Sequence, residues 1–257
     1  MSQLKDNQSQ LYALQESVLK KFQSMGNEQF DAAKLCGGTA LSRCWLGHRV
    51  SYDLDFFLPH GFRVTDLAVS IKKCGINFEA REIVLHEQTA NQLHGDVLHE
   101  GQILKVSFIE DAYFELYPPV TKPFGALNTR TEDIPGLYHR KLLTVSGHGQ
   151  GAEPDSFAGG RQKARDLFDL YVLSSAYMPL KPFMQSLPYS FPEGSFINGL
   201  LSMPWYDLID ELEELICAPK WQPAKDIEFL QTALLDQIDA KPVSEDDDTN
   251  PIADGPS

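Results

Sequence analysis

The spacing of apolar residues predicts helices at both ends of the chain and strands between them. Within residues 8–25, Leu11, Leu14, Val18 and Phe22 recur at intervals of three and four, as in an amphipathic helix. Similar patterns predict helices over 39–46, 64–73, 134–145, 161–177, 181–187, 193–217 and 223–239. Extended patterns predict strands over 50–58, 76–85, 92–99 and 102–109.

The order of these elements predicts an α+β fold, with a small mixed sheet that carries helices on one face. We expect Pro118, Pro119 and Pro123 to end the strand region, and Asp133 to cap the helix that follows. The predicted organisation is an α+β core over 1–130, a helical domain over 131–240 that closes the cleft, and a disordered acidic tail over 241–257.

A glycine pair followed by two aspartates is the strongest chemical signal. Gly37 and Gly38 precede a predicted helix, where free backbone N–H groups bind phosphate. Asp53 and Asp55 lie two residues apart in the extended run, so their side chains share one face of a strand. Because two neighbouring carboxylates repel each other unless a cation lies between them, the pattern predicts a site for a metal-chelated nucleoside triphosphate.

Composition narrows the class of protein. The net charge is −14, of which residues 205–257 carry −11 and residues 1–204 carry −3. Such a chain is a poor sequence-independent binder of nucleic acid, so a nucleic-acid substrate needs a local basic patch. The sequence shows no apolar run of membrane-spanning length and no apolar signal stretch, which predicts a cytoplasmic protein without a membrane partner. We expect the four cysteines to be buried, reduced thiols.

The segment Gly-Gly-Thr-Ala-Leu…Arg-x-Ser-x-Asp-Leu-Asp-Phe-Phe resembles the polymerase-β-like nucleotidyltransferases. The resemblance is closest to the AbiEii/AbiGii-type toxins of type IV toxin–antitoxin systems, and it spans roughly residues 35–175. Four downstream segments also match: Lys105-Val106-Ser107-Phe108, Tyr117-Pro118-Pro119, Lys141-Leu142-Leu143 and Arg165-Asp166-Leu167-Phe168-Asp169-Leu170-Tyr171.

The resemblance implies a metal-dependent transferase that uses a nucleoside triphosphate (NTP). In that reading Asp53 and Asp55 are catalytic and hold Mg²⁺ or Mn²⁺, Lys141 meets phosphate, and Asp166 is essential to activity. It also implies a nucleotide-binding set made of Gly37, Gly38, Thr39, Arg49, Ser51, Lys141 and Asp169.

One position departs from the family pattern. Many polymerase-β-like enzymes carry a third acid on a later strand, where this chain has Ser107. Serine is a poor magnesium ligand beside a carboxylate. Possible substitutes are Glu79, Glu82, Glu110 and Asp111. The sequence does not choose among them, and a single-metal route, or one assisted by Lys141 and Asp166, stays open.

Two groups of polar residues allow a plain structural interpretation. Arg165 and Asp169, four residues apart on a predicted helix, suit a surface salt bridge. We favour the alternative that Asp166 or Asp169 reaches the cleft, because the helix has enough apolar surface to dock beside it. His94, Asp96, His99 and Glu100 fit a surface turn, and Gly147–Gly151 fits a connector.

Three functions follow as hypotheses. The leading one is a toxin that transfers a nucleotide from an NTP to an RNA acceptor such as tRNA. The second is nucleotide transfer to a protein side chain, and the third is a catalytically inert module that binds a nucleotide or a partner. The resemblance further implies a cognate antitoxin.

Overall fold

A computed structural model describes residues 2–85, 90–99, 101–146 and 163–238. The predicted connector at 147–151 and the predicted tail at 241–257 lie outside these ranges. Within them, no helix has both the length and the apolar character needed to cross a membrane.

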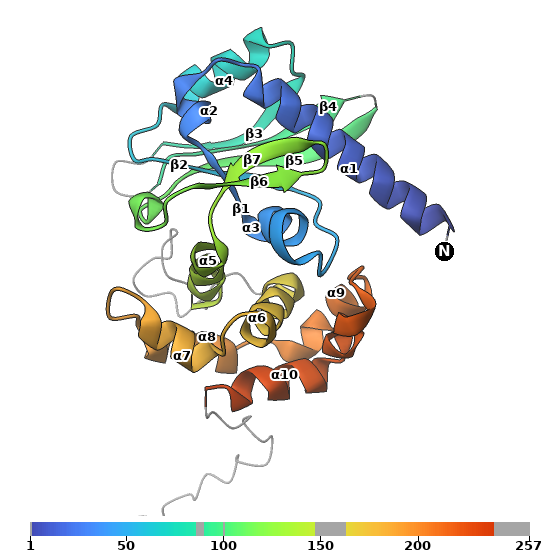
Figure 1. The fold of residues 1–257 in the computed structure, drawn as a ribbon, viewed down its shortest axis with the longest axis vertical. Coiled ribbons are helices and arrows are strands. Elements are labelled where there is room, and N and C mark those ends of the chain that lie inside the picture. Colours follow the sequence, from blue (N-terminus) through green and yellow to red (C-terminus); the bar gives the residue numbers. More distant parts are fainter. Residues whose placement is uncertain (1, 86–89, 100, 147–162, 239–257) are drawn as a thin grey trace, which may run out of the picture.

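The strands of the described chain form one mixed sheet (Figure 1). They are β1 (Lys34–Cys36), β2 (Leu54–Leu58), β3 (Phe78–Val84), β4 (Gln92–His99), β5 (Gln102–Glu110), β6 (Val120–Phe124) and β7 (Leu127–Thr131). Their order is β3-β4-β5-β2-β1-β7-β6. The β2–β5 and β1–β7 pairs are parallel and the others are antiparallel. The predicted α+β class is confirmed.

The sheet extends further along the chain than predicted. The prolines at 118–123 do not end the strand region, because β6 and β7 follow them as a hairpin. Pro123 lies within β6, the strand at the edge of the sheet, where a residue without a backbone N–H is tolerated. Gly125, with φ +61°, makes the turn between the two strands.

The helices divide between the two sides of the sheet. The α-helices are α1 (Ser2–Gln23), α2 (Glu28–Ala32), α3 (Gly37–Ala40), α4 (Val64–Lys73), α5 (Ile134–Ser146), α6 (Ala164–Ala176), α7 (Leu180–Ser186), α8 (Glu193–Leu201), α9 (Ile209–Glu213) and α10 (Ile227–Asp236). In Figure 1, α1, α2 and α4 lie above the sheet, whereas α3, α5, α6 and the later helices lie below it. For the α+β core, the expectation of helices on one face is therefore wrong at α3, which lies on the other side of the sheet (Figure 1).

Local sequence explains the ends of several helices. Asp133 caps α5 as predicted, because its Oδ1 accepts a hydrogen bond of 3.0 Å from the backbone N–H of Gly136. A π-helical turn, Leu41–Leu46, continues α3 and ends at Gly47 in the left-handed conformation. The helix predicted over 193–217 is broken into α8, a 3₁₀ turn at Trp205–Leu208 and α9, because Pro204 interrupts it.

The strand that carries the aspartates is shorter than predicted. It begins at Leu54, so Asp55 lies within β2 and Asp53 precedes it. The backbone at 48–50 pairs elsewhere: Val50 N–H donates to the carbonyl of Ile216, and the carbonyl of His48 accepts from Ala218 N–H. These contacts hold the start of the extended run against the C-terminal region, and only its second half joins the sheet.

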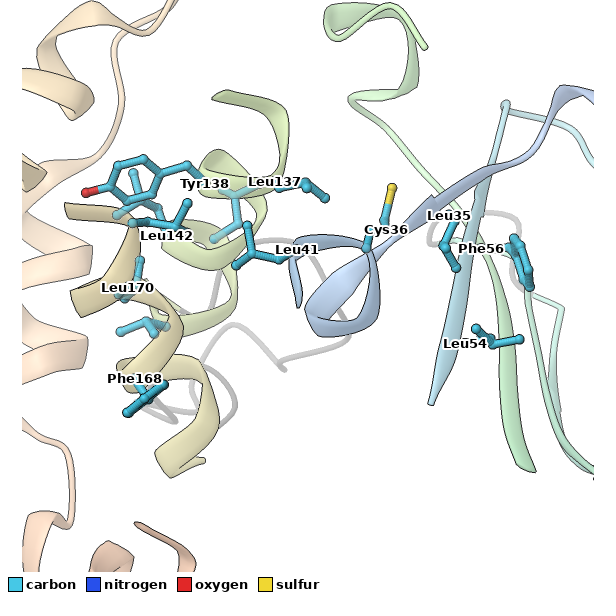
Figure 2. Close-up of a cluster of buried hydrophobic side chains, with 14 of the residues drawn as sticks. Leu35, Cys36, Leu41, Leu54, Phe56, Leu137, Tyr138, Leu142, Phe168 and Leu170 are labelled. Carbon is cyan, nitrogen blue, oxygen red and sulfur yellow. The ribbon is translucent and has the colours of Figure 1, made fainter. Parts of the chain in front are cut away.

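Apolar side chains pack on both sides of the sheet. On the α1 side of the sheet, the ring of Phe22 lies 5.9 Å from that of Phe56. On the other side, Leu41 points toward Leu142 of α5 (Figure 2). Only Cys36 of the four cysteines is buried; Cys44, Cys74 and Cys217 are partly exposed, and all four are free thiols. The predicted burial is thus correct for one thiol.

Candidate active site

The glycine pair forms a tight turn between β1 and α3. Gly37 has φ +68°, a conformation that favours glycine. A Cβ atom at Gly37 would lie 2.6 Å from Oδ2 of Asp55, and one at Gly38 would lie 2.2 Å from Nη2 of Arg49. The absence of side chains therefore lets the Asp55 carboxylate and the Arg49 guanidinium approach the backbone.

Thr39 and Ser51 complete the surroundings of this turn. The buried hydroxyl of Thr39 donates a hydrogen bond of 2.5 Å to the carbonyl of Asp53. The Oγ of Ser51 would lie 3.0 Å from a Cβ at Gly38. In this structure Thr39 ties the helix start to the segment before β2, and the segments holding the glycines and the aspartates lie side by side.

The two aspartates are half-buried and belong to adjoining segments. The side chain of Asp53 is 25% exposed, and its Oδ2 lies 3.3 Å from Nη1 of Arg165 on α6. This basic neighbour comes from the helical half of the chain, so the strand sequence does not show it. Carboxylate oxygens are the ligands that Mg²⁺ prefers, so Asp53 and Asp55, beside an open backbone turn, fit a hard divalent cation.

A buried ion cluster lies next to Arg49. Two nitrogens of Arg49 donate to the two oxygens of Asp169, at 2.6 and 2.7 Å. Lys141 on α5 contacts Asp169 at 2.7 Å and Asp166 at 2.6 Å. Nε2 of His48 lies 2.7 Å from Oδ1 of Asp169. These five residues are almost inaccessible to solvent, and they join the glycine turn to α5 and α6.

Charge and burial together decide the protonation of this cluster. Burial alone would raise the pKa of Asp169, but the charges of Arg49 and Lys141, with hydrogen bonds from Arg49 and His48, hold that pKa well below its usual range. Burial lowers the pKa of His48, although the hydrogen bond and charge of Asp169 oppose this effect. Asp169 is therefore an anion, and the neutral His48 ring donates its Nε2–H to it.

The structure contradicts the surface interpretation of α6. A surface salt bridge between Arg165 and Asp169 is wrong, because Asp169 is fully buried in the ion cluster and Arg165 reaches Asp53 instead. Asp166 is fully buried as well. His48 was missed in the sequence, where its only signal is its place beside Arg49.

A second buried network holds α5 against the sheet. Arg140 binds both oxygens of Asp111 and lies 2.8 Å from Glu132, which in turn lies 3.2 Å from Lys34 of β1. Burial raises the pKa of Asp111, an effect that the charge of Arg140 opposes. This network positions Lys141, the next residue on α5.

Ser107 occupies the position of the third acid, directly beside Asp55. The parallel register of β2 and β5 pairs the two residues. Glu110 lies on the opposite face of β5, where its carboxylate accepts from the N–H groups of Gly61 and Asn91. Asp111 is held by Arg140.

Glu79 and Glu82 lie on β3, at the far edge of the sheet. None of the four possible substitutes is therefore the strand neighbour of Asp55. His94 and Asp96, expected in a surface turn, are instead central residues of β4, and His99 is its last residue. Among the described residues, no group of three or more histidine, cysteine or acidic side chains is arranged to hold a metal.

Backbone N–H groups at a glycine turn, beside two carboxylates, suit the binding of metal-chelated phosphates. The same combination on a mixed α+β sheet is expected of a nucleotidyltransferase. A family model described as "Nucleotidyl transferase AbiEii toxin, Type IV TA system" matches residues 25–187, more than half of the chain. The chain therefore belongs to the AbiEii nucleotidyltransferase toxin family, and membership implies an NTP substrate and an antitoxin partner.

Solved structures of similar shape include two proteins from Helicobacter pylori. JHP933 is 18% identical, with a TM-score of 0.46 over 89% of this chain and 90% of its own. A putative nucleotidyltransferase is 19% identical, with a TM-score of 0.49 over 87% and 91%.

An antigenic nucleotidyltransferase-like protein from Paracoccidioides brasiliensis is 14% identical, with a TM-score of 0.42 over 87% of this chain and 92% of its own. No curated protein sequence matches the chain. The family assignment therefore rests on the family model.

Proposed function

We propose that this toxin transfers a nucleotide from an NTP to an RNA acceptor, such as tRNA, with Mg²⁺ or Mn²⁺ as the metal. The observation that carries the proposal is the contact of the glycine turn with Asp55 and Arg49. This contact supports the proposal because a metal-bound triphosphate requires backbone N–H groups, a carboxylate and a cation close together.

Asp53 and Asp55 would hold the divalent ion together with phosphate oxygens, since Mg²⁺ is usually bound through one or two carboxylates plus substrate phosphates. When bound, the ion neutralises charge that develops on the phosphates during transfer. Gly37 and Gly38 present the backbone to the triphosphate.

The ion cluster would act by orientation. Asp169 fixes the Arg49 guanidinium against Gly38, and Asp166 fixes the Lys141 ammonium. Both cations would face phosphate when the nucleotide enters, while Thr39 and Ser51 shape the turn. We also propose that residues 131–240 form a helical domain that closes over the nucleotide. The contact of Asp169 on α6 with Arg49, and that of Lys141 on α5 with Asp169, support this proposal.

Exposed cations near the site support an RNA acceptor. Arg165, whose side chain is 38% exposed, lies beside Asp53. Lys105 is exposed two residues before Ser107, on the same face of β5. Together they supply local positive charge to a chain that is acidic overall, as phosphate contacts with RNA require.

The test is transfer of label from each α-³²P-NTP into total RNA, with Mg²⁺ or Mn²⁺, compared with the same reaction using γ-³²P-ATP. We expect RNase-sensitive label from one or more α-labelled nucleotides, no label from the γ position, and no transfer by Asp53→Asn or Asp55→Asn. Label that resists RNase and migrates with protein would show that the acceptor is a protein and not RNA. Asp53→Ala and Asp55→Ala variants that kept full toxicity in cells would establish an inert binding module instead.

A further inference from the structure

A row of polar side chains crosses the sheet from Asp55. The strand registers pair Asp55 with Ser107, and Ser107 with His94. Residues paired across neighbouring strands point to the same face, and strands lie about 4.8 Å apart. The neighbours of these residues along β2 and β5, such as Phe56 and Val106, are buried on the other face. Ser107 and His94 therefore extend from the proposed metal ligand on the face that carries it.

The hydrogen bonds of His94 define its tautomer. Its Nε2 lies 2.8 Å from Oε1 of Gln92, an amide oxygen that can only accept. Nε2 thus carries the hydrogen, and Nδ1 of the neutral ring is an acceptor. The hydroxyl of Ser107 lies 3.0 Å from Nδ1 and donates to it. The Ser107 oxygen keeps its lone pairs for a second donor on the side of Asp55.

We propose that Ser107 and His94 form a proton relay for the acceptor hydroxyl. This inference rests on the proposed nucleotide transfer. As the acceptor oxygen bonds to the α-phosphorus and the bond to pyrophosphate breaks, the acceptor proton passes to the Ser107 oxygen. The Ser107 proton passes to Nδ1 of His94, which becomes an imidazolium and later releases the proton to water. Gln92 keeps the ring oriented throughout.

The relay accounts for the missing third acid. A serine in that position is a weak metal ligand, but a serine that donates to an oriented imidazole can accept a proton from a nucleophile. Gln92, His94 and Ser107 are each partly exposed, so an acceptor can reach the row. A second serine–histidine contact provides a control, because Nε2 of His99, the last residue of β4, lies 2.9 Å from the hydroxyl of Ser17 on α1.

The experiment compares His94→Ala, Ser107→Ala and the control His99→Ala with the wild type in steady-state transfer from α-³²P-NTP. We expect kcat to fall about 100-fold or more in His94→Ala, within the range of general base catalysis. In His94→Ala, the KM for NTP should change less than about twofold, and free imidazole should restore part of the transfer rate. Imidazole should not restore Asp55→Asn, and His99→Ala should keep wild-type kcat.

Three results would overturn the relay. One is a kcat of His94→Ala within about threefold of the wild type. Another is a loss of kcat that free imidazole does not reverse, since a structural role for His94 predicts no rescue. The third is nucleotide bound covalently to Ser107. If the wild type transfers nucleotide and Asp55→Asn does not, these results refute the relay alone. A wild type without transfer activity refutes both the relay and the proposed function.

Discussion

Replacing Asp169 by asparagine tests whether the ion cluster holds the helical half against the glycine turn. Oδ1 of Asp169 accepts from Arg49 Nε and His48 Nε2, and Oδ2 accepts from Arg49 Nη2 and Lys141 Nζ. An amide of the same shape has one acceptor oxygen and one donor nitrogen. In either orientation, the amide nitrogen of Asp169→Asn faces two donors.

The magnitude follows from burial and charge. The variant loses two charge-assisted hydrogen bonds, each worth about 1.5–3 kcal/mol. It also leaves Arg49 and Lys141 with one buried carboxylate, Asp166, and removing one partner of a buried pair costs about 3–5 kcal/mol. We expect the free energy of unfolding to fall by about 3–5 kcal/mol. For a chain of this size, that lowers Tm by roughly 10 °C.

The assay is urea unfolding followed by circular dichroism, with thermal melting as a second measure. The matched control is Asp53→Asn, another aspartate with an arginine partner, whose contact is longer and partly exposed to solvent. An exposed pair contributes about 0–1 kcal/mol, so the control should unfold nearly as the wild type does. If Asp169→Asn loses less than about 1 kcal/mol, or no more than Asp53→Asn, the ion cluster does not anchor the helical half.

Three further predictions concern stability and reactivity. Gly38→Ala should lower the free energy of unfolding by about 1–3 kcal/mol, because its Cβ would displace Arg49. In the same urea titration, Gly194→Ala in α8 meets open space and should leave stability unchanged or raise it by up to about 1 kcal/mol. Burial, with the charge of Arg140, lowers the pKa of His139 to about 4. Since the unfolded state takes up this proton near pH 6.5, stability should fall by about 2 kcal/mol from pH 7 to 4.5, and an equal loss in His139→Gln would contradict this. Burial also raises the pKa of the Cys36 thiol, so mass spectrometry should find Cys36 unalkylated by iodoacetamide in the native protein and alkylated in urea.

Local features were predictable from the sequence because neighbours along the chain decide them. The N-cap at Asp133 and the bounds of α4 depend on residues within a few positions, and both were predicted correctly. The α+β class followed from the order of such elements. The hairpin of β6 and β7 was missed because its prolines indicate a break unless the strand lies at the edge of a sheet, and strand order is not a local property.

By itself the sequence determined the glycine turn, the aspartate pair and the family, because each depends on residue types at short, fixed spacings. Only the tertiary structure decided what surrounds them. It enclosed Asp169 with Arg49 and Lys141, brought Arg165 to Asp53, and set Ser107 beside Asp55 and His94 beside Ser107. Charges separated by up to 120 residues meet there because the sheet register and the docking of α5 and α6 fix their positions, and no pattern along the chain encodes those distances.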